Sequence, residues 1–420
     1  MPDSALRPIR PRIAFLDARH ASWYGAQKSL ATLLGAIRDD VDVHFLTTAD
    51  GVLATEMAGR GHRVKVLPLG AGANVFGGQV LRGGLRALLS QATDVVRYWH
   101  AARRWLKRNQ IEVVYANDLR ALLLLGPPAR SLGLPVLWYV REDRRHPVFS
   151  GLGARLATRI ILIARAVGER AFSPGTLRAT GDRFRTVYTG FDCTQYAPQQ
   201  GDRERIRSTW GIGESEKVVG LVGSITPRKG QDVLIAALPE LREAVGDLHV
   251  VMVGDPSAGG EDWAEEQRRS VRELGFSHRV HWVGYHDPIR EAYAGLDALV
   301  LPSSSEGLPR TVIEGLAAGL PVVTYDSGGT REILTDRDLG SMPERGDPRH
   351  LANHLARALT DPDLHTPEVR RKRRVSVTER FTIERFRQGF LEVVREVHPE
   401  FGRDVLHRDV PEVHHTVEML

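Results

Sequence analysis

The sequence predicts an α/β protein in which buried strands alternate with helices. Its 420 residues suit two or three domains, and the apolar content is ample for two cores. Short apolar runs alternate with stretches of helical periodicity. Residues 298–334 contain a complete strand, helix and strand, the unit from which parallel sheets are built.

That unit begins with an apolar run at 298–301, which indicates a buried strand, followed by small turn residues. From Thr311 apolar residues recur at helical spacing until Gly319 and Pro321 end the helix. A second strand at 321–325 leads into a Gly-Gly turn. The loop before the helix therefore offers free backbone N–H groups and the positive end of a helix dipole, which together favour phosphate binding.

Two carboxylates frame this loop. Glu306 lies before the helix and Glu314 lies eight residues later, so roughly 10 Å along the axis could separate them. They cannot easily share one proton or one metal, but they could hold two ends of a ligand. The alternative is that Glu314 is a solvated or capping residue.

The string resembles the signature of the retaining nucleotide-sugar glycosyltransferases of sequence family 4 (glycosyl transferases group 1). The resemblance implies the GT-B architecture, two Rossmann-like doubly wound domains facing each other across a cleft. It also implies hexosyl transfer from a nucleoside diphosphate sugar to a hydroxyl acceptor with retention of configuration. The matching positions are Glu306, Gly307, Glu314, Ala317, Gly319, Pro321 and Val322, with Gly315 where alanine is frequent.

By this resemblance we expect an acceptor-side domain at 1–198 and a donor domain at 199–375. A last helix within 376–398 would cross back to the first domain, and the tail 399–420 shows no periodicity. The basic run 370–374 would then extend the positive face of the first domain.

Composition predicts a cytoplasmic protein. The single cysteine, Cys193, excludes an internal disulfide and favours a reducing compartment. No apolar run reaches 18 residues, and residues 1–12 carry prolines and charges where a signal peptide needs an apolar stretch. Attachment to the inner face of the membrane stays open.

Charge is divided unevenly. Residues 1–200 carry 28 Lys and Arg against 15 Asp and Glu, whereas residues 201–420 carry 29 against 37. The first half therefore faces something anionic, a membrane or a nucleic acid; with the family resemblance we expect no nucleic acid. Residues 86–109 predict a basic amphipathic helix, with either a core-facing apolar stripe and a solvated basic face or a face that docks on anionic lipid.

In the first half we expect strands at 12–16, 41–47 and 63–67, helices at 27–37 and 53–59, and a glycine-rich surface loop at 70–84. The first loop matches the family string at Gly25, Ala26, Lys28, Ser29 and Leu30, with Tyr24 replacing its first glycine. The resemblance places Gly25 near the donor phosphates or the acceptor. A dinucleotide fingerprint is missing here.

Two strand ends face the predicted cleft, at Asn117-Asp118 and at Arg141-Glu142-Asp143. The family often places His-Asp at the second position, where the histidine reaches the donor sugar. Arg141 has two open interpretations: it binds a phosphate or an acidic sugar, or it forms a structural ion pair with Glu142 or Asp143.

The donor domain opens with a strand at 218–223 that ends in Gly223-Ser224 and leads to Arg228-Lys229 before a helix. Two cations there could neutralise a diphosphate, and the resemblance implies that they do. Strands at 249–254 and 280–283 follow; after the latter come the residues that the resemblance places at the nucleotide base, Gly284, Tyr285 and His286.

The resulting hypothesis assigns roles to the cleft residues. Lys229 and Arg228, with N–H groups near Arg310 and Thr311, stabilise charge on the leaving diphosphate. Glu306 positions sugar hydroxyls and Glu314 the ribose. The loop residues Gly307 and Leu308 complete the predicted donor site.

No cofactor and no metal are expected. Three Asp-x-Asp strings, beginning at Asp40, Asp336 and Asp361, lie at a strand start and in charged loops, and the family does not depend on such a metal. Two other functions stay open, that of a nucleotide-sugar epimerase of the same fold and that of a non-catalytic protein that binds anionic surfaces.

Overall fold

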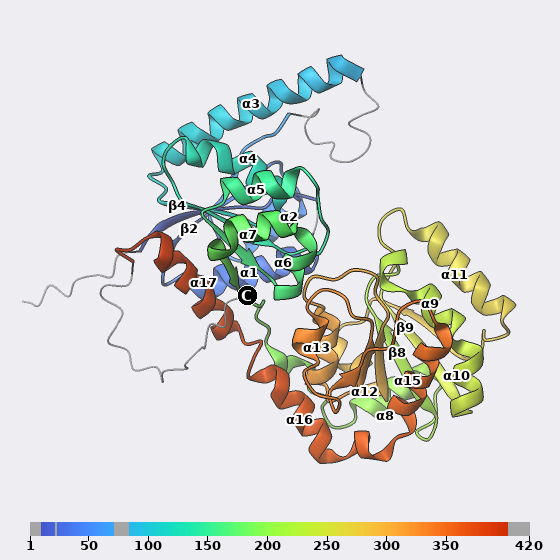
Figure 1. Ribbon diagram of the computed structural model, residues 1–420. Helices are drawn as coiled ribbons and strands as arrows, with labels where there is room; N and C mark the ends of the chain where they lie inside the picture. Colours follow the sequence, from blue (N-terminus) through green and yellow to red (C-terminus); the bar gives the residue numbers. More distant parts are fainter. Residues whose placement is uncertain (1–9, 22, 71–83, 402–420) are drawn as a thin grey trace, which may run out of the picture.

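The computed structural model describes residues 10–21, 23–70 and 84–401, with only the backbone of residues 84–89. The chain forms two α/β units, which occupy the upper left and the lower right of Figure 1. Each unit is built on one parallel sheet, so the predicted α/β class with two Rossmann-like units is confirmed.

The first sheet has seven parallel strands in the order β3-β2-β1-β4-β5-β6-β7. The apolar residues of the central strands β1, β4, β5 and β6 are buried on both faces, as expected for a parallel sheet covered by helices. The strands are β1 (Arg12–Leu16), β2 (Asp42–Thr47), β3 (Val64–Val66), β4 (Val113–Ala116), β5 (Val136–Val140), β6 (Arg159–Leu162) and β7 (Phe184–Thr186).

Helices follow these strands in alternation. They are α1 (Gly25–Ile37), α2 (Val52–Gly59), α3 (Gly84–Arg108), α4 (Leu119–Arg130), α5 (Phe149–Leu156), α6 (Arg165–Ala171) and α7 (Pro174–Thr180). Helix α4 packs against β4 and β5 and contacts both α3 and α5. Of the expected loop at 70–84, residues 71–83 lie outside the described residues.

The second sheet has six strands in the order β10-β9-β8-β11-β12-β13. The strands are β8 (Lys217–Val222), β9 (Leu248–Val253), β10 (Val280–Gly284), β11 (Ala298–Leu301), β12 (Val322–Thr324) and β13 (Gly340–Ser341). The helices are α8 (Asp202–Trp210), α9 (Gln231–Ala236), α10 (Leu238–Val245), α11 (Glu261–Glu273), α12 (Ile289–Gly295), α13 (Arg310–Ala317), α14 (Thr330–Ile333), α15 (Pro348–Thr360), α16 (Pro367–Thr378) and α17 (Ile383–Val397).

The final helix α17 returns to the first unit and packs against α1 (Figure 1). The ring of Phe390 lies 5.9 Å from that of Phe15 in β1 and 5.8 Å from that of Tyr115 in β4. Phe386 lies 6.3 Å from Tyr139 in β5. The apolar face of α17 therefore completes the core of the first sheet.

Strand order reverses between β1 and β4 in the first sheet and between β8 and β11 in the second. Ligands of open parallel sheets bind outside the carboxyl ends of strands at such a point. Asp17 and Asn117 follow the two strands of the first pair, and Gly223 and Pro302 those of the second. These residues mark the edges where a site is expected.

One buried ion network holds α8 to the second sheet. The Arg207 side chain is 1% exposed and donates to Asp297 Oδ2 at 2.7 Å, and Arg203 donates to the other carboxylate oxygen at 2.8 Å. The backbone N–H of Val218 also donates to Asp297. Burial alone would raise the pKa of Asp297, but the two arginines outweigh it and hold the pKa below its usual range.

The basic run 370–374 lies in α16 and is partly structural, which corrects the expectation that it extends a positive face. Arg373 is fully buried and donates to the carbonyls of Asp338, Gly319 and Leu364. Lys372 lies 2.7 Å from both Asp336 and Asp338. Backbone carbonyls bind the Arg373 guanidinium and loop carboxylates bind the Lys372 ammonium group. The carbonyls are needed because a buried guanidinium requires acceptors.

Helix α3 turns its apolar stripe to the core. Tyr98, Ala102 and Leu106 are buried, and Trp99 donates to the Leu123 carbonyl in α4. The exposed side chains of α3 include Arg97, Arg103, Arg104, Lys107 and Arg108. Within the described ranges, every helix is too short or too polar to span a bilayer.

Candidate active site

The loop between β11 and α13 places a helix N-terminus at the edge of the second sheet. Thr311 Oγ1 donates to the carbonyl of Val222 at 3.2 Å, which ties the first turn of α13 to the end of β8. Its hydroxyl is therefore engaged, while the first-turn backbone N–H groups of Arg310 and Thr311 have no intrahelical acceptor. The helix begins at Arg310, with Pro309 as its N-cap.

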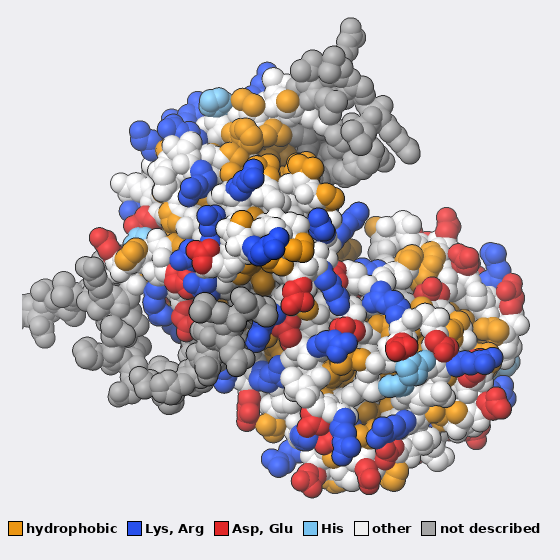
Figure 2. Space-filling model, in the orientation of Figure 1, with side chains coloured by type: hydrophobic (Ala, Val, Ile, Leu, Met, Phe, Trp, Pro, Cys, Tyr) orange, Lys and Arg blue, Asp and Glu red, His pale blue; other side chains and the backbone are white. Residues whose placement is uncertain are grey.

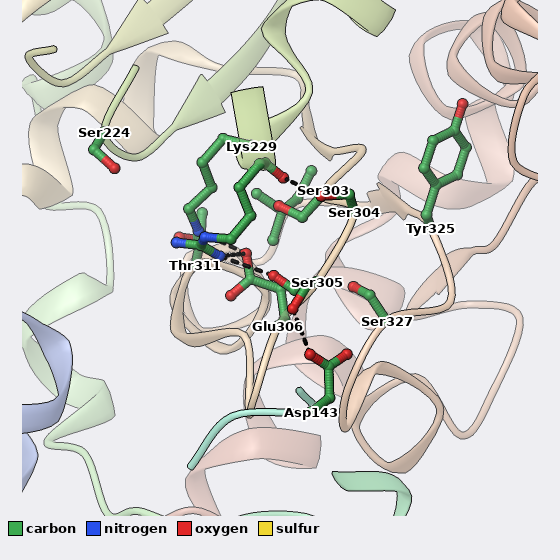
Figure 3. A network of polar contacts seen from close by, with 12 residues as sticks. Asp143, Ser224, Lys229, Ser303, Ser304, Ser305, Glu306, Thr311, Tyr325 and Ser327 are labelled. Atoms are coloured by element: carbon green, nitrogen blue, oxygen red, sulfur yellow. Dashed lines mark hydrogen bonds and ion pairs between the residues drawn. The ribbon is translucent and has the colours of Figure 1, made fainter. Parts of the chain in front are cut away.

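Lys229, Arg228 and Glu306 meet at this edge, as the close-up in Figure 3 shows for Lys229 and Glu306. Lys229 Nζ donates to Glu306 Oε1 at 2.7 Å, and Arg228 Nη1 donates to the same oxygen at 3.0 Å. Arg228 also donates to the Ser305 carbonyl at 2.9 Å. Two cations thus converge on one carboxylate beside the tip of α13.

The charge of Glu306 is held by these cations. Burial alone would raise the pKa of Glu306, but Lys229 and Arg228 outweigh it and keep the pKa below its usual range. The carboxylate therefore stays ionised at neutral pH, with both cations next to the position where a diphosphate would meet the helix tip. The two cations already in place can therefore bind an anion at this position.

Glu314 belongs to a second, separate cluster. Tyr293 in α12 donates to Glu314 Oε2 at 2.7 Å, and Arg310 lies 3.5 Å from Glu314 Oε1. The Arg310 guanidinium also stacks on Phe191 at 4.9 Å. Burial, followed by the Glu314 charge, raises the pKa of Tyr293, so its hydroxyl stays protonated as a donor.

Nothing in the sequence pattern selects Tyr293 or Phe191 as site residues. Tyr293 is 21 residues from Glu314, on a different helix, and a lone tyrosine in a helical pattern indicates only core packing. Glu306 and Glu314 nevertheless lie in the two different polar clusters that a ligand held at both ends requires.

The loop between β11 and α13, residues 302–309, which we name the donor loop after the predicted ligand, touches the first unit directly. A Cβ on Gly307 would lie 2.0 Å from the carbonyl oxygen of Arg141, so only glycine fits there. Ser305 Oγ donates to Asp143 in the loop after β5 (Figure 3). The Gly329 N–H donates to the Gly307 carbonyl at 2.7 Å.

Glu332 in α14 holds the two units together beside this loop. Its carboxylate accepts the backbone N–H groups of Arg165 and Ala166, at the start of α6, each at 3.0 Å. It also accepts the Tyr188 hydroxyl at 2.8 Å. The sequence alone assigns no partner to Glu332, because the residues that it contacts lie more than 140 positions away.

Arg141 is fixed by neutral groups, so of its two open interpretations the ion pair with Glu142 or Asp143 is wrong. Its Nε donates to Asn117 Oδ1 at 2.9 Å, its Nη1 to Ser29 Oγ at 3.2 Å, and its guanidinium lies 4.1 Å from the centre of the Tyr139 ring. Glu142 and Asp143 pair with Arg19 and Arg170. Among the described residues, Arg141 Nη2 has no hydrogen-bond partner.

The expected base-binding residues follow β10. Gly284 has φ +67°, and Tyr285 next to it is 69% exposed, free to cover a flat ring. His286 lies 3.3 Å from Glu291. The ring of Tyr285 therefore offers an exposed apolar surface just beyond β10.

The remaining predicted residues line the same edges. Gly223 has φ +148°, and a Cβ there would lie 3.4 Å from Lys229 Cε; Ser224 accepts a hydrogen bond from Gln231 through its carbonyl. Gly25 at the start of α1 lies opposite Arg310, whose Cδ would be 3.6 Å from a Cβ on the glycine. Leu308 is buried, so only its backbone can reach a ligand.

Asp118 caps α4, just beyond the carboxyl end of β4, by accepting the Ala121 N–H at 2.7 Å. Burial, and then the charge of Asp17, raises the pKa of Asp118 to about 6. Because an unfolded aspartate titrates near about 3.9, the stability gained from the protonated form is complete below about pH 4 and lost as pH rises through about 6.

The variant Asp118→Asn keeps an amide oxygen for the cap and removes this ionisation. We expect its free energy of unfolding at pH 8 to exceed that of the wild type by about 1–2 kcal/mol, with the difference vanishing near pH 4. Urea unfolding at both pH values measures it. Equal stability at pH 8 would contradict the raised pKa.

The described part of the chain contains no group of three or more His, Cys, Asp or Glu side chains placed to hold a metal. Its Asp-x-Asp strings have other partners. Asp40 pairs with Arg387, Asp336 and Asp338 both hold Lys372, and Asp361 caps a short 3-10 turn.

Known proteins resemble this chain in sequence and structure. The family model for glycosyl transferases group 1 matches residues 202–374. A D-inositol 3-phosphate glycosyltransferase of Salinispora arenicola is 30% identical over 338 residues, which cover 76% of this chain and 73% of that protein. The matching protein of Nocardia farcinica is also 30% identical, with 69% of this chain and 63% of that protein covered.

Other similar proteins have names or bound ligands that indicate different substrates. A GDP-mannose-dependent alpha-(1-6)-phosphatidylinositol monomannoside mannosyltransferase of Mycolicibacterium smegmatis is 28% identical, covering 72% of this chain and 82% of that protein. HepE of Anabaena, crystallised with UDP, superposes with a TM-score of 0.75 at 22% identity, covering 92% of this chain and all of that one. The chain belongs to the group 1 glycosyltransferases and has their GT-B fold.

Proposed function

We propose that the protein transfers a hexosyl group from a nucleoside diphosphate sugar to a hydroxyl acceptor with retention of configuration, as expected for sequence family 4. The observation that carries this proposal is the convergence of Lys229 and Arg228 on Glu306 at the N-terminus of α13. Cations and helix N–H groups at one point stabilise the charge that develops on a leaving diphosphate.

In the proposed reaction, the bond between the anomeric carbon and the diphosphate oxygen breaks first. Lys229, Arg228 and the α13 N–H groups bind the departing charge, Glu306 binds sugar hydroxyls and Glu314 binds the ribose. The acceptor oxygen attacks from the same face and passes its proton to the leaving phosphate oxygen. This route requires no metal and no cofactor.

The relatives support a nucleotide-sugar donor and an anionic or lipid-linked acceptor, since their names include GDP-mannose, inositol 3-phosphate and phosphatidylinositol monomannoside. The Arg141 guanidinium, which pairs with no carboxylate among the described residues, supports an anionic group on the substrate. We also propose that the protein acts in the cytoplasm in peripheral contact with an anionic membrane.

A thermal-shift screen against UDP, GDP, ADP and dTDP sugars identifies the donor. Incubation of that donor with candidate acceptors, followed by NMR of the anomeric proton, then tests transfer and retention. The variant Glu306→Ala is expected to stay folded and lose transfer, whereas full turnover would contradict the assigned site. An epimer formed from donor alone would favour the epimerase function instead.

A further inference from the structure

We propose that the segment from Arg144 to Arg155, which comprises the loop after β5 and most of α5, inserts into the surface of an anionic lipid bilayer. This inference rests on the membrane contact proposed above and names the residues that make it. It assigns insertion to α5, whereas the sequence offered lipid docking of residues 86–109, now α3, as one of two alternatives.

The segment exposes three large apolar side chains. Val148 is 73% exposed, Phe149 47% and Leu152 43%. Residues spaced three and four apart lie on one side of a helix, so Leu152 stands beside both others. The other exposed large hydrophobic residues of the described chain are scattered singly over other elements. A contiguous apolar group on a water-facing helix indicates a contact surface.

The same segment carries positive charge that the protein does not use. Arg144, Arg145 and Arg155 are exposed and form no ion pair or hydrogen bond with the described residues. Residues 144–158 contain no Asp or Glu. Arginines with apolar neighbours and no internal partner match the phosphates and acyl boundary of an anionic membrane.

Helix α3 lacks the apolar half of this combination. Its basic residues are exposed, but Tyr98, Ala102 and Leu106 are buried, and Val96 is the one large hydrophobic exposed among its described side chains, at 45%. Both helices contact α4 (Figure 1), and blue side chains dominate the upper lobe in Figure 2. We therefore assign long-range attraction to α3 and insertion to α5.

The position of the segment connects docking to the reaction. Asp143, directly before it, accepts a hydrogen bond from Ser305 of the donor loop, and the Arg141 carbonyl packs against Gly307. A bilayer bound at Arg144 to Leu152 therefore borders the edge of the cleft. A hydroxyl on a lipid headgroup would be presented there without leaving the membrane plane.

Sedimentation with vesicles tests the assignment. The full chain is mixed with vesicles of phosphatidylcholine alone or of phosphatidylcholine with phosphatidylglycerol. We expect binding only to the anionic vesicles, weakened at least about tenfold by the triple variant V148S/F149S/L152S. The triple variant R144Q/R145Q/R155Q is expected to weaken it about 100-fold at low salt, since each basic residue contributes about fivefold.

Matched controls lie on the second unit. Leu274, also 43% exposed, is replaced by serine, and binding is expected to stay at the wild-type value. A probe gives a second readout in an otherwise intact chain. Phe149→Cys labelled with a polarity-sensitive dye is expected to shift to the blue on anionic vesicles, whereas Leu274→Cys is not. Burial raises the pKa of the native Cys193 to about 11, so it reacts little.

Three results would overturn the assignment. In the first, the wild type does not bind anionic vesicles. In the second, the apolar triple variant binds them as tightly as the wild type does. In the third, the wild type forms a dimer without lipid and the apolar triple variant does not, which would assign the surface to a second copy of the chain. Sugar transfer to a water-soluble acceptor by a protein that does not bind vesicles would reject docking and leave the proposed transfer intact. Loss of donor binding in the wild type would reject the transfer instead.

Discussion

Replacing Lys229 by alanine is expected to lower kcat for sugar transfer by about 10²–10³-fold, the usual loss when one preorganised charge donor is removed. Lys229 Nζ lies 2.7 Å from Glu306 Oε1, and its side chain is 11% exposed. It therefore acts in a site with little water, where its charge on a leaving diphosphate is weakly screened. Steady-state kinetics with the identified donor measure the loss.

Two further variants serve as controls for this prediction, one away from the site and one within it. Lys65→Ala, at an exposed position on β3, is expected to leave kcat unchanged. The double variant Lys229→Ala with Glu306→Gln distinguishes two roles. If Lys229 only neutralised Glu306, the double variant would have the same kcat as Glu306→Gln alone. If Lys229 stabilises the diphosphate, the double variant is slower than Glu306→Gln alone. Full activity of Lys229→Ala with an unchanged circular dichroism spectrum would disprove the assigned role.

Replacing Asp297 by alanine is expected to lower the free energy of unfolding of the second unit by about 3–5 kcal/mol, because it leaves buried guanidinium charge without its counterion. Arg207 and Arg203 both donate to this carboxylate, as does the Val218 N–H. The remaining contacts of the buried Arg207 are to backbone carbonyls, which cannot replace a charge. Guanidinium unfolding followed by fluorescence measures the difference.

An exposed ion pair provides the contrast. Asp247, 79% exposed, lies 3.2 Å from Arg279, and Asp247→Ala is expected to cost at most about 1 kcal/mol. Replacing both Arg207 and Asp297 by apolar residues of similar volume is expected to cost less than Asp297→Ala alone. If the Asp297→Ala protein were as stable as the Asp247→Ala protein, the buried position of the Asp297 network would not increase its contribution to stability, and the prediction would be wrong.

Local patterns predicted the strands and the donor loop. The apolar runs before Gly223 and Pro302 are continuous because parallel strands are buried on both faces, so each strand end could be located from the sequence. The helix after Pro309 followed from its periodicity. These features depend on neighbours in the chain, and the structure placed Lys229 and Glu306 together across 77 residues because two adjacent strands end there.

Side-chain partners across elements could not be predicted in this way. Glu332 reaches Ala166 across 166 residues and Arg141 reaches Ser29 across 112; neither pairing leaves a periodic trace. The basic character of residue 373 suggested solvent, but three backbone carbonyls at the ends of other elements surround it. The packing geometry of distant segments determined these contacts.

The return of α17 to the first sheet affects how the chain matures. The aromatic surface at Phe15 and Tyr115 is covered by Phe390, which leaves the ribosome only after the entire second unit has been made. The N-terminal half therefore emerges with an unfinished interior, and a polypeptide stopped before residue 383 is a natural target for chaperones and proteases. The order of synthesis therefore distinguishes full-length chains, which can complete the first core, from truncated chains, which cannot.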